Sequence, residues 1–277
     1  MLTGSKYLVE EYNASDVREL MEYFQKLLPF SVNMTAAVRD YPERCTVLVA
    51  RGNNEIEGSL VEFNSGYNGH IWFNPIRWVS GNAEVASLLV KKAGFRPSIT
   101  ISESDFSFLI DPSDIPVSVF EEFIMTTGCG GSSPTFFQND SQIRQMTVDD
   151  AVDSLVFSGY KNSELNSITL EREMRFLSER TCLGLFIHGK LVSSGSIMST
   201  TPEFSSVGAF RTDESLRKQG FGSRIILSTL KKAQSVSQST CLFVRSTNTS
   251  AINIYSKLGF EVKKSVFFTD IGTGLIP

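Results

Sequence analysis

Apolar positions along the chain recur either every second residue or every three to four residues, the periods of strands and helices. In the second half, antiparallel strand pairs combine with a helical crossover. Such an order predicts an α+β (α/β-like) domain, in which helices flank a mixed sheet. The predicted elements are a strand at 142–146, helices from 149 to about 178, a hairpin at 182–199, a strand at 206–212, a helix at 221–235, a strand at 240–245, a helix at 249–258 and a strand at 260–269.

The two halves of the chain share a weak internal repeat. One predicted hairpin contains Gly52 and Gly58, the other contains Gly189 and Gly195, and both pairs are offset by 137 residues. A helical pattern rich in Leu, Lys and Ala follows the hairpin in each half. Because solenoid repeats have periods of about 20–50 residues, this long period indicates two domains of one architecture.

A segment of small and helix-breaking residues separates the halves. Residues 126–134 read Thr-Thr-Gly-Cys-Gly-Gly-Ser-Ser-Pro, a composition typical of a linker. We therefore expect a first domain at 1–125, a linker at 126–140 and a second domain at 141–277.

Composition and charge narrow the possible partners. Of the 277 residues, 41% are hydrophobic and 20% are charged, a balance that predicts a folded globular protein. The net charge of −4 leaves no basic surface of the kind expected for a nucleic-acid or anionic-membrane partner. No apolar run approaches the ~20 residues that span a bilayer, and the first residues resemble neither a secretory signal nor a transit peptide. A cytoplasmic location is expected.

Cysteine and histidine usage argues against a metal site or a disulfide framework. The cysteines are far apart without a C-x-x-C pair, and only two histidines are present. We expect free thiols and no bound metal. The residues concerned are Cys45, Cys129, Cys182, Cys241, His70 and His188.

A glycine-containing loop carries the first candidate chemistry. The segment Arg217-Lys-Gln-Gly-Phe-Gly-Ser223 lies between the strand at 206–212 and the helix at 221–235. Glycines let backbone N–H groups approach an anion closely, the helix N-terminus adds a positive dipole, and Arg217 and Lys218 add charge. An acidic protein can therefore bind a diphosphate locally at this loop.

A second motif follows about thirty residues later. Asn248 precedes a short predicted helix, Ala251 and Tyr255 share one face of it at i and i+4, and Gly259 ends it. The two motifs, in this order and spacing, resemble the GNAT superfamily of acyl-CoA-dependent N-acyltransferases over roughly residues 141–270. The resemblance implies acetyl-CoA or another acyl-CoA as co-substrate. It implies coenzyme A contacts at Phe210, Arg211, Thr212, Arg217, Lys218, Gln219, Gly220, Phe221, Gly222, Ser223, Asn248, Ala251, Ile252 and Tyr255.

A narrower resemblance extends over the whole chain. Residues 36–50, Ala-Ala-Val-Arg-Asp-Tyr-Pro-Glu-Arg-Cys-Thr-Val-Leu-Val-Ala, look like the amino-terminal arm of the glycine N-acyltransferase family. This implies glycine or a related amino acid as acceptor, and leaves a mitochondrial location open. In the first half the counterpart loop at 77–82 lacks paired glycines and no Asn-Ala-Tyr-Gly-Phe series follows. We expect tandem GNAT-type mixed sheets, of which the first half is degenerate.

The same resemblance implies direct attack of an amine on the thioester, with Tyr255 as proton donor to the departing thiolate. The general base is less defined, because Ser206 stands where relatives carry a glutamate. Glu203 is the candidate catalytic base, and a water chain or a helical carboxylate such as Glu164 is an alternative.

The leading hypothesis is an N-acyltransferase that acts on a small amine or amino acid. A protein or peptide acceptor is the nearest alternative, and a catalytically silent coenzyme A-binding module is an alternative from another class. The sequence carries no signal for the oligomeric state.

Overall fold

The computed structural model describes residues 6–12, 17–64, 75–94, 96–107, 117–128 and 140–271. The chain divides into two compact units. The first comprises Met1–Ile124, Phe243–Thr249 and Val262–Pro277, and the second comprises Met125–Leu242 and Ser250–Glu261.

This division differs from the sequence-based boundaries at one element in particular. Strand β12 (Glu261–Ile271) pairs antiparallel with β5 (Ser98–Ser102), with Phe267 opposite Ser102 and Ile271 opposite Ser98. The pairing covers an edge of β5 that would otherwise expose unpaired backbone groups. The end of the chain therefore contributes to the first unit. Residues 129–139 of the predicted linker lie outside the described residues.

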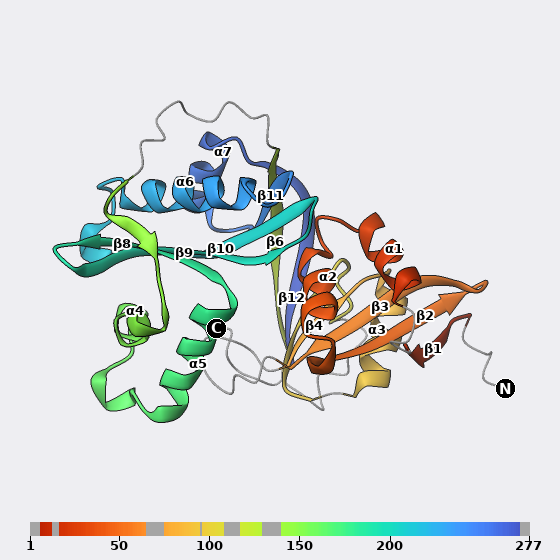
Figure 1. Cartoon of the computed structure of the whole chain (residues 1–277). Coiled ribbons are helices and arrows are strands. Elements are labelled where there is room, and N and C mark those ends of the chain that lie inside the picture. The colour runs from red at the N-terminus through yellow and green to blue at the C-terminus, as the bar shows by residue number, and fades with distance from the viewer. Residues whose placement is uncertain are drawn as a thin grey trace. The chain divides into compact units, whose positions relative to one another are not determined.

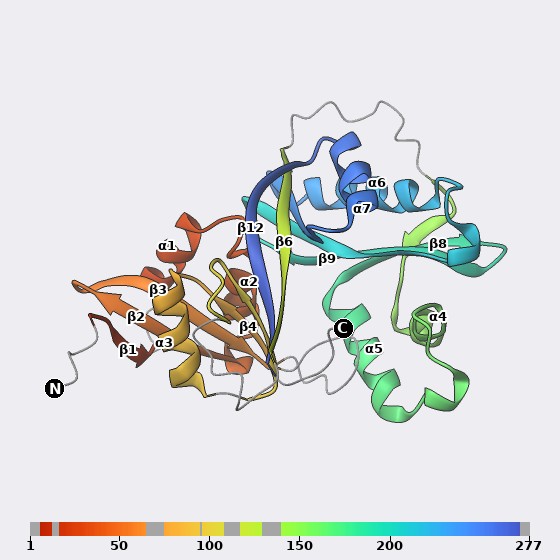
Figure 2. The same ribbon diagram turned by 180° about the vertical axis from the view of Figure 1, so that it is seen from behind.

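In the first unit, the strands are hydrogen-bonded in the order β1-β2-β3-β4-β5-β12-β6. The β4–β5 pair is parallel, whereas β1–β2, β2–β3 and β3–β4 are antiparallel. Helices α1 and α2 cover one face of this sheet and α3 covers the other (Figures 1 and 2). The further elements are β1 (Leu8–Glu11), α1 (Arg18–Lys26), α2 (Val32–Asp40), a 3-10 turn (Pro42–Arg44), β2 (Cys45–Gly52), β3 (Glu55–Phe63), β4 (Ile76–Val79), α3 (Ala83–Ala93) and β6 (Val117–Gly128).

The core of the first unit forms where α3 packs on the sheet. Val85 and Leu89 of the helix are fully buried against Leu60 and Val79 of the strands. Gly58 allows this close approach, because a Cβ atom there would overlap Val85 Cγ1 and lie 2.7 Å from the Ser80 carbonyl oxygen. The second glycine of the first predicted hairpin, Gly58, thus serves helix packing.

Replacing Gly58 by Ala is expected to destabilise the first unit by about 1–3 kcal/mol, because the added methyl group overpacks the α3 contact. Chemical denaturation followed by circular dichroism measures this loss. Gly128→Ala is the matched control, since no atom lies within 4 Å of the added Cβ. Equal midpoints for the two variants would contradict the packing role of Gly58.

The second unit repeats this order of elements. Its strands run β11-β10-β9-β8-β7, with a parallel β10–β11 pair and antiparallel pairs elsewhere. Helices α6 and α7 lie on one side of β8–β10, and α4 and α5 lie on the other (Figure 1). The elements are β7 (Ile143–Gln145), α4 (Ala151–Phe157), α5 (Ser167–Glu179), β8 (Thr181–Ile187), β9 (Lys190–Thr200), β10 (Phe204–Thr212), α6 (Phe221–Gln234), β11 (Ser239–Arg245) and α7 (Thr249–Lys257), with 3-10 turns at Val148–Asp150, Asn162–Glu164 and Glu214–Leu216.

The shared strand order confirms the predicted tandem architecture of mixed sheets flanked by helices. One boundary in the first half was wrong, because residues 77–79 of the predicted loop belong to β4. Only Ser80, Gly81 and Asn82 connect β4 to α3.

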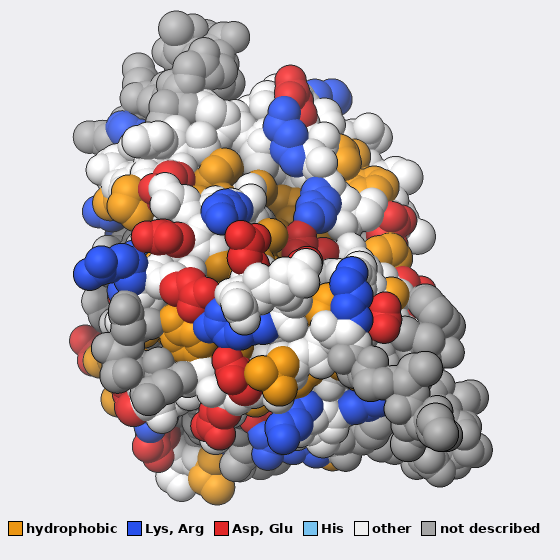
Figure 3. All heavy atoms as spheres, turned by 90° about the vertical axis from the view of Figure 1, so that its right-hand side faces the viewer, with side chains coloured by type: hydrophobic (Ala, Val, Ile, Leu, Met, Phe, Trp, Pro, Cys, Tyr) orange, Lys and Arg blue, Asp and Glu red, His pale blue; other side chains and the backbone are white. Residues whose placement is uncertain are grey.

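Charged side chains of both signs are interspersed on the face shown in Figure 3. In the first unit, Arg51 illustrates how they pair, since it contacts Glu10 at 2.8 Å and Glu19 at 2.7 Å. None of the described helices has both the length and the apolar character needed to cross a membrane. Cys45, Cys182 and Cys241 are free thiols.

Candidate functional site

Among the described residues, strand β10 has no partner along one edge over most of its length. Its parallel pairing with β11 runs from Phe204 opposite Ser239 to Ser206 opposite Cys241 and then stops. Strand β10 nevertheless continues to Thr212. Backbone N–H and C=O groups on that edge are therefore available to an extended ligand, as on an added strand.

A β-bulge interrupts β10 at its centre. Gly208 lies opposite Ser196 and Arg211 opposite Ser194, so that Ala209 and Phe210 together face the single residue Gly195. Ala209 has a φ of 54°, a left-handed conformation that costs an L-residue about 1–2 kcal/mol. Bulges of this kind redirect backbone groups and cluster next to active sites.

The bulge directs neighbouring side chains to opposite faces. Phe210 packs on the α6 side, where a Cβ atom on Gly195 would approach its ring to 2.5 Å and the Thr229 hydroxyl to 3.0 Å. Arg211 points the other way and donates to the Ser158 carbonyl at 2.8 Å. The predicted contact residues Phe210 and Arg211 are therefore neighbours along the β10 backbone, but their side chains lie on opposite faces of the sheet.

The N-terminus of α6 presents uncapped donors. Its N-cap residue, Gly220, has a φ of 85° and no side chain to accept a hydrogen bond. Lys218 also has a positive φ, 64°. In this described segment the backbone N–H groups from Lys218 to Ser223, including those of Gln219, Phe221 and Gly222, have no acceptor. Successive free N–H groups at a helix N-terminus bind anions.

Charged groups flank these donors. Arg217 Nη2 lies 2.9 Å from Glu214 Oε1, with both side chains more than half exposed. Gly222 lies beside the end of β10, since an added Cβ would come to 3.2 Å from Thr212 Oγ1. The loop therefore joins the unpaired edge of β10 to the helix N-terminus.

In the part of the first unit that the structure describes, both features are missing. Strand β4 pairs with β5 over its whole length, from Ile76 opposite Ile99 to Val79 opposite Ser102. The Asn82 side chain caps α3 by accepting from the Val85 N–H at 3.0 Å. The predicted degeneracy of the first half thus has a structural basis. The β4 edge is occupied by β5, and the N-terminus of α3 is capped by the Asn82 side chain.

Helix α7 ends in a Schellman-type turn that fixes Tyr255. Gly259 has a φ of 86°, and the Phe260 N–H bonds to the Tyr255 carbonyl at 3.0 Å. The Phe260 ring meets the Tyr255 ring edge-on, with 5.9 Å between centroids. The ring of Phe210, on β10, lies 6.2 Å from the Tyr255 ring. The Tyr-Ser-Lys-Leu-Gly-Phe sequence therefore sets the position of the tyrosine ring.

The Tyr255 side chain is 9% exposed, and its hydroxyl forms no hydrogen bond with any described residue. Burial raises the pKa of Tyr255 to about 12. The phenol therefore stays protonated at neutral pH and can act as a proton donor.

Of the remaining predicted contacts, Ala251 and Ile252 lie on α7 in the second unit. Asn248 belongs to the first unit, where its N–H bonds to the Arg245 carbonyl at 2.9 Å.

The candidate bases differ in their surroundings. Glu203 precedes β10, and its carbonyl accepts from the Ser239 N–H at 2.9 Å. Ser206 is buried beside Cys241 and hydrogen-bonds its thiol. The Glu164 carboxylate caps its own turn, because it accepts a hydrogen bond from the Lys161 N–H at 2.7 Å. No three metal-ligating side chains cluster within the described part of the chain.

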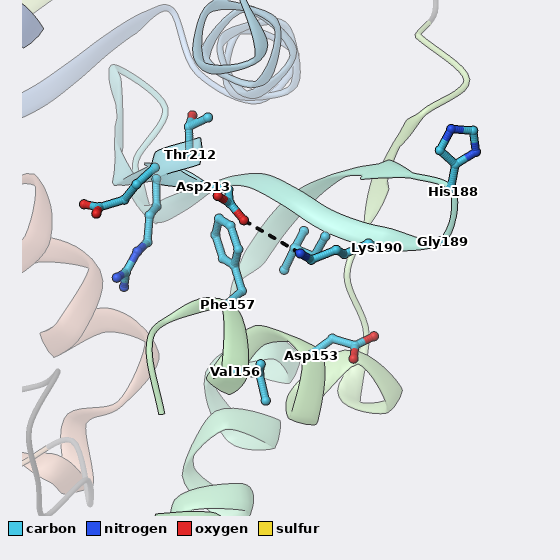
Figure 4. Close-up of a pocket in the computed structure, with 11 residues that line it drawn as sticks. Asp153, Val156, Phe157, His188, Gly189, Lys190, Thr212 and Asp213 are labelled. Carbon is cyan, nitrogen blue, oxygen red and sulfur yellow. Dashed lines mark ion pairs between the residues drawn. The ribbon is translucent and has the colours of Figure 1, made fainter. Parts of the chain in front are cut away.

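A cavity of about 600 Å³ opens at the end of β10 on the α4 side (Figure 4). Phe157 rises from α4 toward Asp213, which forms a 3.9 Å ion pair with Lys190, whereas His188 points away from these groups. The Ser215 hydroxyl and N–H hold the pKa of Asp213 below its ordinary value. Sequence reasoning missed this cavity. Its lining residues are Asp153, Val156, Phe157, His188, Gly189, Lys190, Leu191, Arg211, Thr212, Asp213 and Glu214.

Comparisons with known proteins agree with this geometry. Residues 183–268 match the family model described as FR47-like protein. No curated protein matched the sequence.

Solved structures resemble the chain over nearly its whole length. The structure of a Drosophila protein is 13% identical, with a TM-score of 0.67 and coverage of 95% of this chain and 98% of that one. A GCN5-related N-acetyltransferase from Sphaerobacter thermophilus is 12% identical, with a TM-score of 0.58 and coverage of 97% and 96%. A tandem GNAT protein from the clavulanic acid biosynthesis pathway is 16% identical, with a TM-score of 0.56 and coverage of 96% and 98%. The chain therefore has the fold of the GNAT acetyltransferases, built twice in tandem, and residues 183–268 carry the FR47-like match.

Proposed function

We propose that the second unit catalyses acyl transfer from acetyl-CoA, or a longer acyl-CoA, to the amine of a small acceptor. The observation that carries this proposal is the unpaired edge of β10, which ends beside the uncapped N-terminus of α6. An extended arm attached to a diphosphate has the chemistry that these two adjacent features accept.

The residues divide into two groups by role. Backbone N–H groups from Lys218 to Ser223 and the Arg217 side chain hold the diphosphate. The β10 edge from Phe210 to Thr212 pairs with the pantetheine arm, and Ala251 and Ile252 complete its contacts. Coenzyme A supplies the activated thioester, and the chain's own groups position it and move protons.

The bulge and the tyrosine serve the chemical step. A backbone N–H redirected at Ala209 and Phe210 polarises the thioester carbonyl, in the manner of an oxyanion hole. The acceptor amine attacks directly, and Tyr255 donates a proton to the departing sulfur. No covalent enzyme intermediate is required.

A small amine or amino acid such as glycine is the favoured acceptor. Support comes from the likeness of residues 36–50 to the glycine N-acyltransferase arm, and from the cavity of about 600 Å³ beside β10, a volume suited to a small molecule. A peptide acceptor is the alternative within enzymes, and a silent coenzyme A-binding module is the alternative outside them.

Release of free thiol from acetyl-CoA, measured with a panel of amino acids, simple amines and peptides, tests the proposal. We expect thiol release that depends on a small acceptor and yields the N-acylated product by mass spectrometry. Release only with peptides would favour the peptide alternative. Binding of coenzyme A without release for any acceptor or acyl chain would contradict catalysis and favour the silent module.

A further inference from the structure

Helix α5 carries a carboxylate on its buried stripe. Glu173 precedes Phe176 and Leu177 by three and four residues, so the three side chains share one face. Phe176 is 7% and Leu177 3% exposed. A carboxylate on such a face is unusual, because burial penalises its charged form.

The environment of Glu173 prepares it to accept a proton. Its Oε1 accepts a hydrogen bond from Ser154 Oγ of α4 at 2.6 Å. Burial raises the pKa of Glu173, and the Ser154 hydrogen bond acts in the opposite direction. No cation forms an ion pair with it among the residues that the structure describes.

Few ionisable groups surround this carboxylate. Tyr160, in the connection between α4 and α5, and Cys182, on β8, are both influenced by its charge. Arg172 of α5 acts on Tyr160, and Arg180 acts on Cys182. In the turn before α4, Asp150 is paired with Arg144 at 2.6 Å.

The carboxylate faces a row of residues that leads to the bulge. Cys182, Ser196 and Gly208 lie directly opposite one another on β8, β9 and β10. They point to the α5 side, because the next residue on β9, Gly195, faces Phe210 and α6. Gly208 is therefore roughly 10 Å from Cys182, two strand spacings of about 4.8 Å.

The sheet is open at the end of this row. A Cβ atom added to Gly208 would meet only Met198 Cγ, at 3.8 Å. Gly208 also comes immediately before the bulge at Ala209 and Phe210. Gly208 and the Glu173 carboxylate, which acts on Cys182 in the same row, therefore lie on the same side of the sheet, the α5 side.

We propose that Glu173 is the general base of the reaction and that Ser154 tunes it. This inference rests on the proposed function. Glu173 removes one proton from the ammonium group of the acceptor and later releases it to solvent. The neutral nitrogen forms the new C–N bond, the C–S bond breaks, and the second nitrogen proton replaces the one that Tyr255 gives to sulfur. Glu173 thus takes the role first considered for Glu203 and Glu164.

The pH dependence of kcat/KM tests this role. Glu173→Gln is expected to lower kcat/KM at pH 7 at least tenfold. It should also remove the ascending limb of the pH profile, the rise in kcat/KM that accompanies deprotonation of this carboxylate. Ser154→Ala is expected to shift that limb upward by about one pH unit, because the carboxylate loses the hydrogen bond that favours its charged form. A weakly basic amine, already neutral at pH 7, should restore most of the Glu173→Gln rate.

A matched variant separates this role from a structural one. Glu171→Gln removes an exposed carboxylate from the same helix and should keep the wild-type profile. The Kd for coenzyme A should stay unchanged in Glu173→Gln.

The two proposals fail in different ways. A wild-type rate and profile in Glu173→Gln, or an unshifted limb in Ser154→Ala, would overturn the role of Glu173 while acyl transfer stands. Absence of acyl transfer in the wild-type protein would instead overturn the proposed function, and with it this inference.

Discussion

Replacing Tyr255 by Phe is expected to lower kcat about 100-fold, at the lower end of the range for general acid–base catalysis. The phenol is buried, has a pKa of about 12 and forms no hydrogen bond with the described residues, so its proton is available to the departing sulfur. The Kd for coenzyme A should change less than about twofold, because the ring contacts with Phe210 and Phe260 remain. Steady-state kinetics and calorimetric titration measure the two quantities.

The pH range of this effect follows from the raised pKa. Because the phenol is neutral well below pH 12, the ratio of wild-type to Tyr255→Phe rates should be constant from pH 6 to pH 9. Tyr41→Phe, in the first unit, is the control and should keep the wild-type kcat. A wild-type kcat in Tyr255→Phe would show that this tyrosine only packs against its neighbours.

Replacing Arg217 by Glu is expected to weaken coenzyme A binding about 100-fold. A charge-assisted hydrogen bond contributes about 1.5–3 kcal/mol, and every 1.4 kcal/mol is tenfold in affinity. The variant also leaves Glu214, 2.9 Å from the native guanidinium, beside a second carboxylate where the diphosphate would bind. Retention on immobilised coenzyme A and calorimetric titration give the result.

Arg175→Glu is the matched control for charge. Arg175 also pairs with a carboxylate one turn away on its own helix, Glu171 at 3.7 Å, but lies on α5 rather than at the α6 N-terminus. It should retain the wild-type Kd. Full retention of Arg217→Glu on the coenzyme A resin would mean that the diphosphate binds elsewhere.

Local sequence patterns were sufficient to predict most elements of the second unit. The predicted helix at 221–235 is α6 at Phe221–Gln234, and the predicted strand at 240–245 is β11 at Ser239–Arg245. These elements are strongly periodic and end at glycines or loops, so neighbouring residues alone define them.

The glycine-containing loop at 217–223 was predictable for the same reason. Gly220 gives the left-handed N-cap and leaves the α6 N–H groups uncapped, a property encoded within a few residues. The tyrosine motif is equally local, because Gly259 and Phe260 close the turn that holds the Tyr255 ring.

The general base was not predictable from local patterns. Glu203 was considered because of its position along the chain, whereas Glu173 is distinguished by its half-buried place on α5 and its hydrogen bond with Ser154, 19 residues earlier. Burial depends on how α4 and α5 pack on the sheet, and hydrophobic periodicity does not report which polar residue lies inside.

The sequence by itself determined the repeated order of elements, the uncapped glycine loop and the tyrosine turn, because each depends on residues within one or two turns of each other. Only the tertiary structure decided where β10 separates from β11, that Ala209 adopts a positive φ, that β12 pairs with β5, and that Glu173 lies half-buried beside Ser154. Strand register and burial arise from contacts between distant segments, whose free energies local propensity does not contain.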